Sequence, residues 1–183
     1  PTTLDGWADA EDDFAKALPF FERATELDAN YAEAWYQAGF CYGALGRHQD
    51  ALKASKQAAK LRPDWPETYA NIGASSYALG QYKEAADAYK SAIRLDDDNP
   101  ETQYAYGLTL NKLNKPDEEI LAYRRVISVK PDHANALDKL GQAYFKKKRW
   151  NEAAATFWPA SDLQAGFPYL QFAWREPAGT RQI

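Results

Sequence analysis

Residues 70–95 read ANIGASSYALGQYKEAADAYKSAIRL, and this stretch decides the fold of the chain. Its first half carries small residues around Gly73, and its second half carries apolar residues at helical spacing, with Gly80 between the two halves. Apolar positions three and four residues apart predict a helix, and glycine supplies the left-handed turn that ends one. The stretch therefore predicts two consecutive helices joined by a short turn.

The same pattern recurs along the chain at a fixed interval. The glycine of the first half stands in register four times, at Gly39, Gly73, Gly107 and Gly141. Small or β-branched residues mark the second half of each unit, at Ala58, Ala92, Val126 and Ala160. A glycine that recurs with a period of about 34 residues indicates stacked copies of one small unit rather than a single globular core.

The residues between and around the expected helices agree with this division. Gly46 and Gly80 stand where the first helix of a unit must stop, and Asn114 takes that place in the third unit. Lys148 holds it in the fourth unit, where we expect a turn of different geometry. Prolines lie at the other boundaries, closing second helices or opening first ones, at Pro63, Pro66, Pro100 and Pro131.

This pattern resembles the tetratricopeptide repeat (TPR). The resemblance is carried by residues 32–51, AEAWYQAGFCYGALGRHQDA, and by residues 70–95, and it covers roughly residues 8–157. It implies an all-α fold, a right-handed α-solenoid of antiparallel helix pairs. The repeats are expected at residues 32–65, 66–99, 100–133 and, as a partial copy, 134–157.

The third unit departs most from the pattern. Glu119 occupies a position that is alanine in the other units, which places a carboxylate at a helix–helix contact. Gln103 replaces a large apolar residue, Pro116 replaces the usual aromatic after the turn, and Asp97 replaces the closing proline. Proline early in a helix is tolerated. The unit is expected to fold with the others despite these changes.

The two flanks do not contain whole repeats. Residues 1–31 carry the spacing of a second helix, through Phe14 and Phe21, without room for the usual first helix. The chain begins with proline and has no methionine, so we expect it to be a piece of something longer. Residues 158–183 are aromatic, and they fit a cap on the last repeat, a segment that occupies a groove, or a docking tail. The aromatic and apolar residues of this tail are Trp158, Phe167, Tyr169, Leu170, Phe172 and Trp174.

Composition bounds the class of protein. A hydrophobic content of 45% excludes disorder over most of the chain. No run of eighteen apolar residues occurs, so no transmembrane segment is expected, and the compartment stays open between cytoplasm and periplasm. Cys41 is the single cysteine, which excludes a disulfide framework and reads as a small buried hydrophobe.

The net charge of −4 is unevenly distributed along the chain. Residues 1–33 carry nine acids and two bases, residues 34–133 carry thirteen of each, and residues 134–183 carry four acids and seven bases. The asymmetry fits solvated helix ends. It also fits head-to-tail association of copies, which complementary charge would steer.

In the resembled fold, the first helix of each pair lines a concave groove. The side chains expected there to bind a partner are Tyr36, Gln37, Phe40, Asn71, Tyr77, Tyr104, Leu108, Asn111 and Phe145. An acidic edge is expected at Glu33, Glu67 and Glu101. This surface favours a protein or peptide with apolar anchors and basic residues. Alternatively, neighbouring repeats bury some of the rings, and the glutamates suit the positive ends of helix dipoles.

No convergent set of reactive groups predicts an enzyme. His48 and His133 stand apart in expected inter-helix turns, and Asp96–Asn99 lacks the glycine and distal glutamate of a calcium loop. The basic run Lys146–Arg149 lies at an expected helix C-terminus, where the helix dipole favours cations. Because the chain as a whole is acidic, we do not expect nucleic acid to be the partner. We therefore expect a protein-interaction scaffold or adaptor without metal or cofactor. The alternatives are a self-assembling scaffold and the targeting domain of a longer enzyme.

Overall fold

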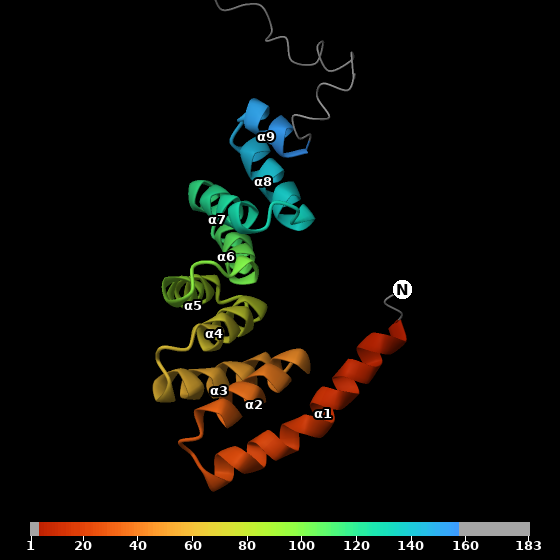
Figure 1. The fold of residues 1–183 in the computed structure, drawn as a ribbon, viewed down its shortest axis with the longest axis vertical. Coiled ribbons are helices and arrows are strands. Elements are labelled where there is room, and N and C mark those ends of the chain that lie inside the picture. The colour runs from red at the N-terminus through yellow and green to blue at the C-terminus, as the bar shows by residue number, and fades with distance from the viewer. Residues whose placement is uncertain (1–3, 158–183) are drawn as a thin grey trace, which may run out of the picture.

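The computed structural model describes residues 4–157, and within them the chain forms nine helices and no strand (Figure 1). Their bounds are α1 (Leu4–Leu27), α2 (Ala32–Ala44), α3 (His48–Leu61), α4 (Pro66–Ala78), α5 (Tyr82–Leu95), α6 (Pro100–Lys112), α7 (Pro116–Val129), α8 (Ala134–Lys146) and α9 (Trp150–Phe157). The all-α fold expected from the sequence is confirmed.

The helices stack in chain order along one long axis, with α1 at one end and α9 at the other (Figure 1). Each helix packs on the next, and α2 also contacts α4, as α4 contacts α6. The core is accordingly a series of small clusters. One joins Leu18, Cys41 and Ala54, the next joins Leu52, Ile72 and Ala88, and two more follow along the axis. Stability in such an array comes from each unit and its contacts with its neighbours.

Two of the repeated glycines, Gly73 and Gly107, let an aromatic ring lie against a helix backbone. A Cβ atom added at Gly107 would stand 2.4 Å from Cε1 of Tyr123, and one at Gly73 would stand 2.7 Å from Cε1 of Tyr89. Tyr123 and Tyr89 belong to the second helices of the same pairs and are 0% and 4% exposed. Glycine is required at these positions because the ring fills the space of a side chain.

All four turns inside the helix pairs share one backbone conformation. Their φ angles are positive, at 72° for Gly46, 75° for Gly80, 55° for Asn114 and 57° for Lys148. The expectation of a different turn at Lys148 is therefore wrong. Two backbone hydrogen bonds close this turn as they close the first one, because Lys148 N donates to Phe145 O at 2.9 Å and Arg149 N to Tyr144 O at 3.0 Å.

At the N-terminal end, α1 is one helix with Pro19 inside it. Phe14 and Phe21 pack beside Leu18 against α2, as expected for the second helix of a pair. The alternatives for the aromatic tail, residues 158–183, lie outside the described residues. Among the described helices, none has the length and apolar character needed to cross a membrane.

Candidate peptide-binding groove

The first helices of the pairs carry all of the predicted groove side chains. α2 provides Tyr36, Gln37 and Phe40, α4 provides Asn71 and Tyr77, α6 provides Tyr104, Leu108 and Asn111, and α8 provides Phe145. Because α2 contacts α4 and α4 contacts α6, the side chains of these three helices form a row across the repeats.

Asn71 stands between two hollows in this row. The first, about 260 Å³ in volume, is bounded by Phe40, Asn71 and the N-terminal end of α3 at His48. The second, about 210 Å³, is bounded by Tyr36 and Asn71 together with residues of α5 and α6. The Nδ2 atom of Asn71 is buried and has no hydrogen-bond partner within the described structure. A buried amide without a partner is costly, so this position suits a ligand that supplies one.

The predicted aromatic residues differ in how far they are available to a ligand. Phe40 and Phe145 are 45% and 62% exposed, and each meets one further ring edge-on, Phe14 and Trp150 respectively. The three tyrosines of the row are half-buried against rings of their neighbours. These pairs are Tyr36 with Trp65 at 4.4 Å, Tyr77 with Tyr82 at 5.4 Å, and Tyr104 with His133 at 5.1 Å between ring centroids.

Of the predicted groove residues, Tyr36, Phe40 and Asn71 line the two hollows, and the others do not. The others are Gln37, Tyr77, Tyr104, Leu108, Asn111 and Phe145. Gln37 is exposed and Leu108 is half-buried. The side chain of Asn111 is engaged within the protein, because its Nδ2 donates to Oε1 of Glu119 at 2.7 Å. Asn111 therefore positions a buried carboxylate of the third unit, and this role was not anticipated from the sequence.

Glu119 is 3% exposed, which confirms that the third unit places a carboxylate at a helix–helix contact. Burial raises the pKa of this carboxyl group above its ordinary value. The hydrogen bond from Asn111 and the charges of Lys146 and Lys139 oppose that rise without cancelling it. A carboxyl group with a raised pKa in the folded state makes the fold less stable once it ionises.

We expect Glu119→Gln to stabilise the protein at pH 7. Glutamine keeps an acceptor for Asn111 and removes the buried charge. Between the ordinary and the raised pKa the folded state holds more protons than the unfolded state, so wild-type stability falls as pH rises through this window. The gain in free energy of unfolding should be roughly 1 kcal/mol at pH 7 and should vanish below pH 4, where both states of the wild type are protonated.

Urea unfolding of both proteins at pH 4 and pH 7 measures this difference. The adjacent Glu118 is the control, because a hydrogen bond from Lys115 lowers the pKa of its carboxyl group. Glu118→Gln should therefore change stability slightly in the opposite direction. A Glu119→Gln variant that is no more stable than wild type at pH 7 would contradict the assignment.

The predicted acidic edge is not uniform. Glu33 forms an ion pair with Arg62, with 2.5 Å between Oε1 and Nη1, whereas Glu67 and Glu101 line the second hollow. Asp96 lines it as well. Asp96 was not among the predicted groove residues, because residues 96–99 were considered only as a cation loop, whose glycine and distal glutamate they lack. The available signal was its position, one full repeat after Arg62.

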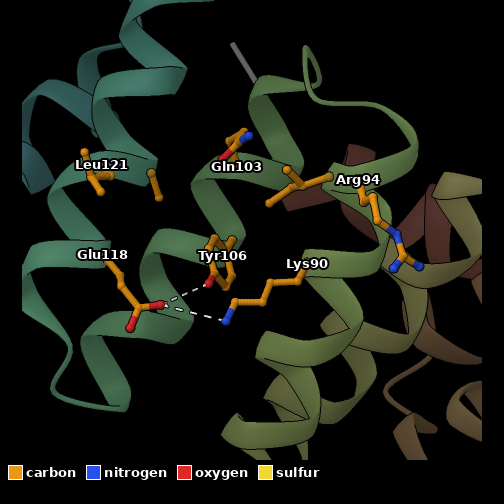
Figure 2. Close-up of a pocket in the computed structure, with 8 residues that line it drawn as sticks. Lys90, Arg94, Gln103, Tyr106, Glu118 and Leu121 are labelled. Carbon is orange, nitrogen blue, oxygen red and sulfur yellow. Dashed lines mark hydrogen bonds and ion pairs between the residues drawn. The ribbon is translucent and has the colours of Figure 1, made fainter.

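A third hollow lies outside the predicted groove, between α5 and α7 with α6 behind it (Figure 2). It has a volume of about 380 Å³ and uses Gln103 and Tyr106 of α6 rather than Tyr104 and Leu108. Glu118 accepts a hydrogen bond from the Tyr106 hydroxyl at 3.4 Å and lies 3.9 Å from Nζ of Lys90 (Figure 2). Its lining residues are Lys90, Ile93, Arg94, Gln103, Tyr106, Glu118, Leu121 and Ala122.

Neither reactive nor metal-binding groups converge in the described part of the chain. No three His, Cys, Asp or Glu side chains there are close enough to hold a metal ion. Cys41 is 3% exposed, and burial raises the pKa of its thiol, as expected for a residue of the core. His133 caps α8, where its Nδ1 accepts from the backbone N–H of Ala136 at 3.2 Å.

Comparison with solved structures finds similar solenoids. A crystal structure of MamA superposes with a TM-score of 0.77 at 26% sequence identity, covering 86% of this chain and 92% of that one. A second crystal structure of MamA gives a TM-score of 0.76 at 28% identity and covers 81% of each chain. The structure of YrrB, described as a TPR protein with an unusual peptide-binding site, gives 0.72 at 24% identity, covering 90% of this chain and 85% of that one.

Comparison with family models agrees with the similarity to these solved structures. Residues 10–74, 100–133 and 120–157 match models described as tetratricopeptide repeat, and residues 75–114 match one described as TPR repeat. Together these matches run without a gap from residue 10 to residue 157. With its regular repeat period, its stacked antiparallel helix pairs and its likeness to solved TPR solenoids, the chain belongs to the tetratricopeptide repeat family and has the fold of a protein-interaction scaffold.

Proposed function

We infer that this chain is a scaffold that binds a partner peptide or short helix along α2, α4 and α6. The observation that carries this function is the hollow beside Phe40 and Asn71. There, an aromatic ring that is 45% exposed borders a space of about 260 Å³, and a buried amide in its wall lacks a partner. An apolar side chain of the partner would fill the space beside the ring, and its backbone carbonyl would accept from Asn71.

Several properties of the row favour an extended or helical segment over a compact small molecule. Tyr104 continues the apolar surface onto α6, and Phe145 lies further along the stack on α8. Both hollows of the row have volumes below the roughly 300–1,000 Å³ of small-molecule sites. A partner that places separate side chains in successive hollows fits this geometry, and interfaces concentrate their binding energy in such anchors.

Selection from a random dodecapeptide library displayed on phage tests the function directly. We expect selected peptides to carry apolar anchors and to bind with micromolar dissociation constants, which correspond to a binding free energy of about −8 kcal/mol. Phe40→Ala combined with Tyr104→Ala should weaken binding at least tenfold, because truncation of an anchor contact typically costs more than about 1 kcal/mol. Isothermal titration calorimetry with one synthetic selected peptide measures the change.

Leu121→Ala is the matched control, because Leu121 is 63% exposed and lines the third hollow, between α5 and α7. It should leave the affinity unchanged. Circular dichroism melting curves separate lost binding from lost folding in the double variant. If the folded double variant binds the peptide as tightly as the wild type does, the groove assignment fails.

A further inference from the structure

The second hollow of the row contains three carboxylates and no basic residue. We call it the acidic hollow. Its lining residues are Tyr36, Pro66, Glu67, Ala70, Asn71, Ala92, Asp96, Asn99, Glu101 and Thr102. Glu67 and Glu101 lie in the first turns of α4 and α6, where the helix dipole favours negative charge. Asp96 is different, because it is the C-cap residue of α5. The dipole disfavours a carboxylate at that end of a helix.

The repeat register shows what Asp96 replaces. The C-cap residues of α3, α5 and α7 are Arg62, Asp96 and Lys130, which stand one repeat period apart. In the first unit, Arg62 pairs with Glu33 at 2.5 Å and its guanidinium lies 4.2 Å from the ring centroid of Trp65. The second unit keeps the acid, as Glu67, but has a carboxylate where the neutralising cation would stand. Glu67 therefore lacks, at the position of Asp96, the cation that Arg62 provides for Glu33.

The aspartates that follow do have a counter-ion. Arg125 Nη2 lies 3.1 Å from Asp97 and 2.6 Å from Asp98. Asp96 Oδ1 instead accepts from the backbone N–H of Asp98 at 3.2 Å, and no ion pair joins Asp96 to a basic group of the described residues. The Arg125 pairs leave the carboxylate that faces the hollow uncompensated.

One polar side chain in the wall lacks a partner. The Nδ2 atom of Asn71 is buried and has no hydrogen-bond partner among the described residues. Thr102 also lines the hollow and is 8% exposed, and its backbone N–H donates to Asn99 Oδ1 at 2.9 Å. Buried polar groups are normally paired, so the amide of Asn71 indicates a ligand that is missing.

Tyr36 completes the wall with an aromatic ring that is held against Trp65. Burial and the charge of Glu67 raise the pKa of its hydroxyl. The side chain of Asn71 lies near enough to oppose that rise, yet its Nδ2 atom does not reach hydrogen-bonding geometry with any described group. The hollow therefore offers a ligand an aromatic ring beside its carboxylates.

We propose that the acidic hollow accepts one lysine or arginine side chain of the partner segment, which takes the place that Arg62 occupies in the preceding unit. The volume of about 210 Å³ suits a single side chain. A metal ion does not fit, because no three described ligands converge on one point. An ammonium or guanidinium group carries several N–H donors and can serve carboxylates that lie apart, together with the Thr102 hydroxyl. A cation over the face of Tyr36 gains further attraction.

This inference rests on the proposed groove function and can be tested separately from it. Peptides selected against the wild type should be enriched in lysine or arginine at a fixed distance from their apolar anchor. One selected peptide and its Lys→Gln or Arg→Gln counterpart are then titrated against Asp96→Arg, which restores the cation found in the preceding unit. We expect at least a tenfold loss of affinity for the basic peptide and less than a twofold loss for its glutamine counterpart.

Asp87→Arg is the matched control, because it changes the net charge by the same amount as Asp96→Arg. Asp87 is exposed on α5 and does not line the acidic hollow. It should affect both peptides alike. Asp96→Asn keeps an acceptor for the Asp98 N–H and should give a smaller, roughly threefold loss for the basic peptide only. Circular dichroism verifies folding of each variant.

The inference is overturned if the selected peptides show no preference for lysine or arginine. It is also overturned if Asp96→Arg weakens binding of the basic peptide and of its glutamine counterpart equally, or weakens binding of neither. If the Phe40 and Tyr104 double variant loses binding and Asp96→Arg has no effect, the groove function is supported and the basic subsite is refuted. If Asp96→Arg has the expected effect and the double variant binds normally, the acidic hollow is supported as a binding site and the apolar row is refuted.

Discussion

Gly107→Ala is expected to destabilise the protein by about 3 kcal/mol, the upper part of the range for overpacked cores. The new methyl group would lie 2.4 Å from Cε1 of Tyr123 and 2.8 Å from its Cδ1 and Cζ. Tyr123 is fully buried and its ring lies beside that of Tyr104, with 5.8 Å between the centroids, so a shift of the ring must displace packed neighbours. Either α6 and α7 separate or the ring leaves its rotamer. Urea unfolding monitored by circular dichroism measures the loss.

Gly43→Ala is the control for this substitution. Gly43 also lies within a first helix, but a Cβ atom there meets only the Cβ of Ala51 at an ordinary distance of 3.9 Å. Alanine in a helix interior is favoured over glycine by roughly 0.5–1 kcal/mol, so this variant should be more stable than wild type. Combining Gly107→Ala with Tyr123→Leu should recover part of the loss by removing the ring. A Gly107→Ala variant as stable as Gly43→Ala would refute the close ring–backbone contact.

Leu110→Ala is expected to cost a similar amount, about 3 kcal/mol. Leu110 is 1% exposed and lies in the cluster that joins α5, α6 and α7, beside Tyr89 and Ala122. Removing three carbons from a filled core loses transfer free energy and leaves a cavity, which together cost roughly 2–5 kcal/mol for Leu→Ala. Leu121→Ala on the neighbouring helix removes the same atoms from a site that is 63% exposed and should change stability by less than about 0.5 kcal/mol.

Hydrogen exchange measures which helices lose stability in the Leu110→Ala variant. Each unit is stabilised by its own contacts and by those with its nearest neighbours, so a cavity at the centre should speed amide exchange in α5, α6 and α7 more than in α2 and α3. Local openings report such differences directly. Uniform acceleration from α1 to α9 would show instead that the described residues unfold as one cooperative unit.

The sequence predicted the helix pairs because their signals are local. Helical spacing of apolar residues and a residue suited to the left-handed turn lie within a few positions of each other, as at Gly80. Lys148 shows the limit of this reasoning. Lysine has no preference for a positive φ, yet the paired backbone hydrogen bonds from Lys148 and Arg149 impose the same turn. Tertiary packing of the two helices outweighs the local preference of one residue.

The candidate site was predictable only in outline. The first helices were identified as the source of groove residues, but the state of each side chain depends on contacts distant in sequence. Asn111 is engaged by Glu119, and Glu33 is neutralised by Arg62, which is 29 residues further along the chain. The third hollow, between α5 and α7, had no sequence signal of its own, since it requires two helices from different units.

By itself, the sequence determined the architecture: its regular repeat period requires stacked helix pairs, and its glycines require close contact within each pair. Only the tertiary structure decided which polar and charged groups remain free. A local pattern specifies backbone conformation, because hydrogen bonds within a helix join near neighbours. The charge compensation that decides this site joins residues about one repeat apart. It leaves Glu33 paired with Arg62 and leaves Asp96, in the matching position, facing a hollow without a cation.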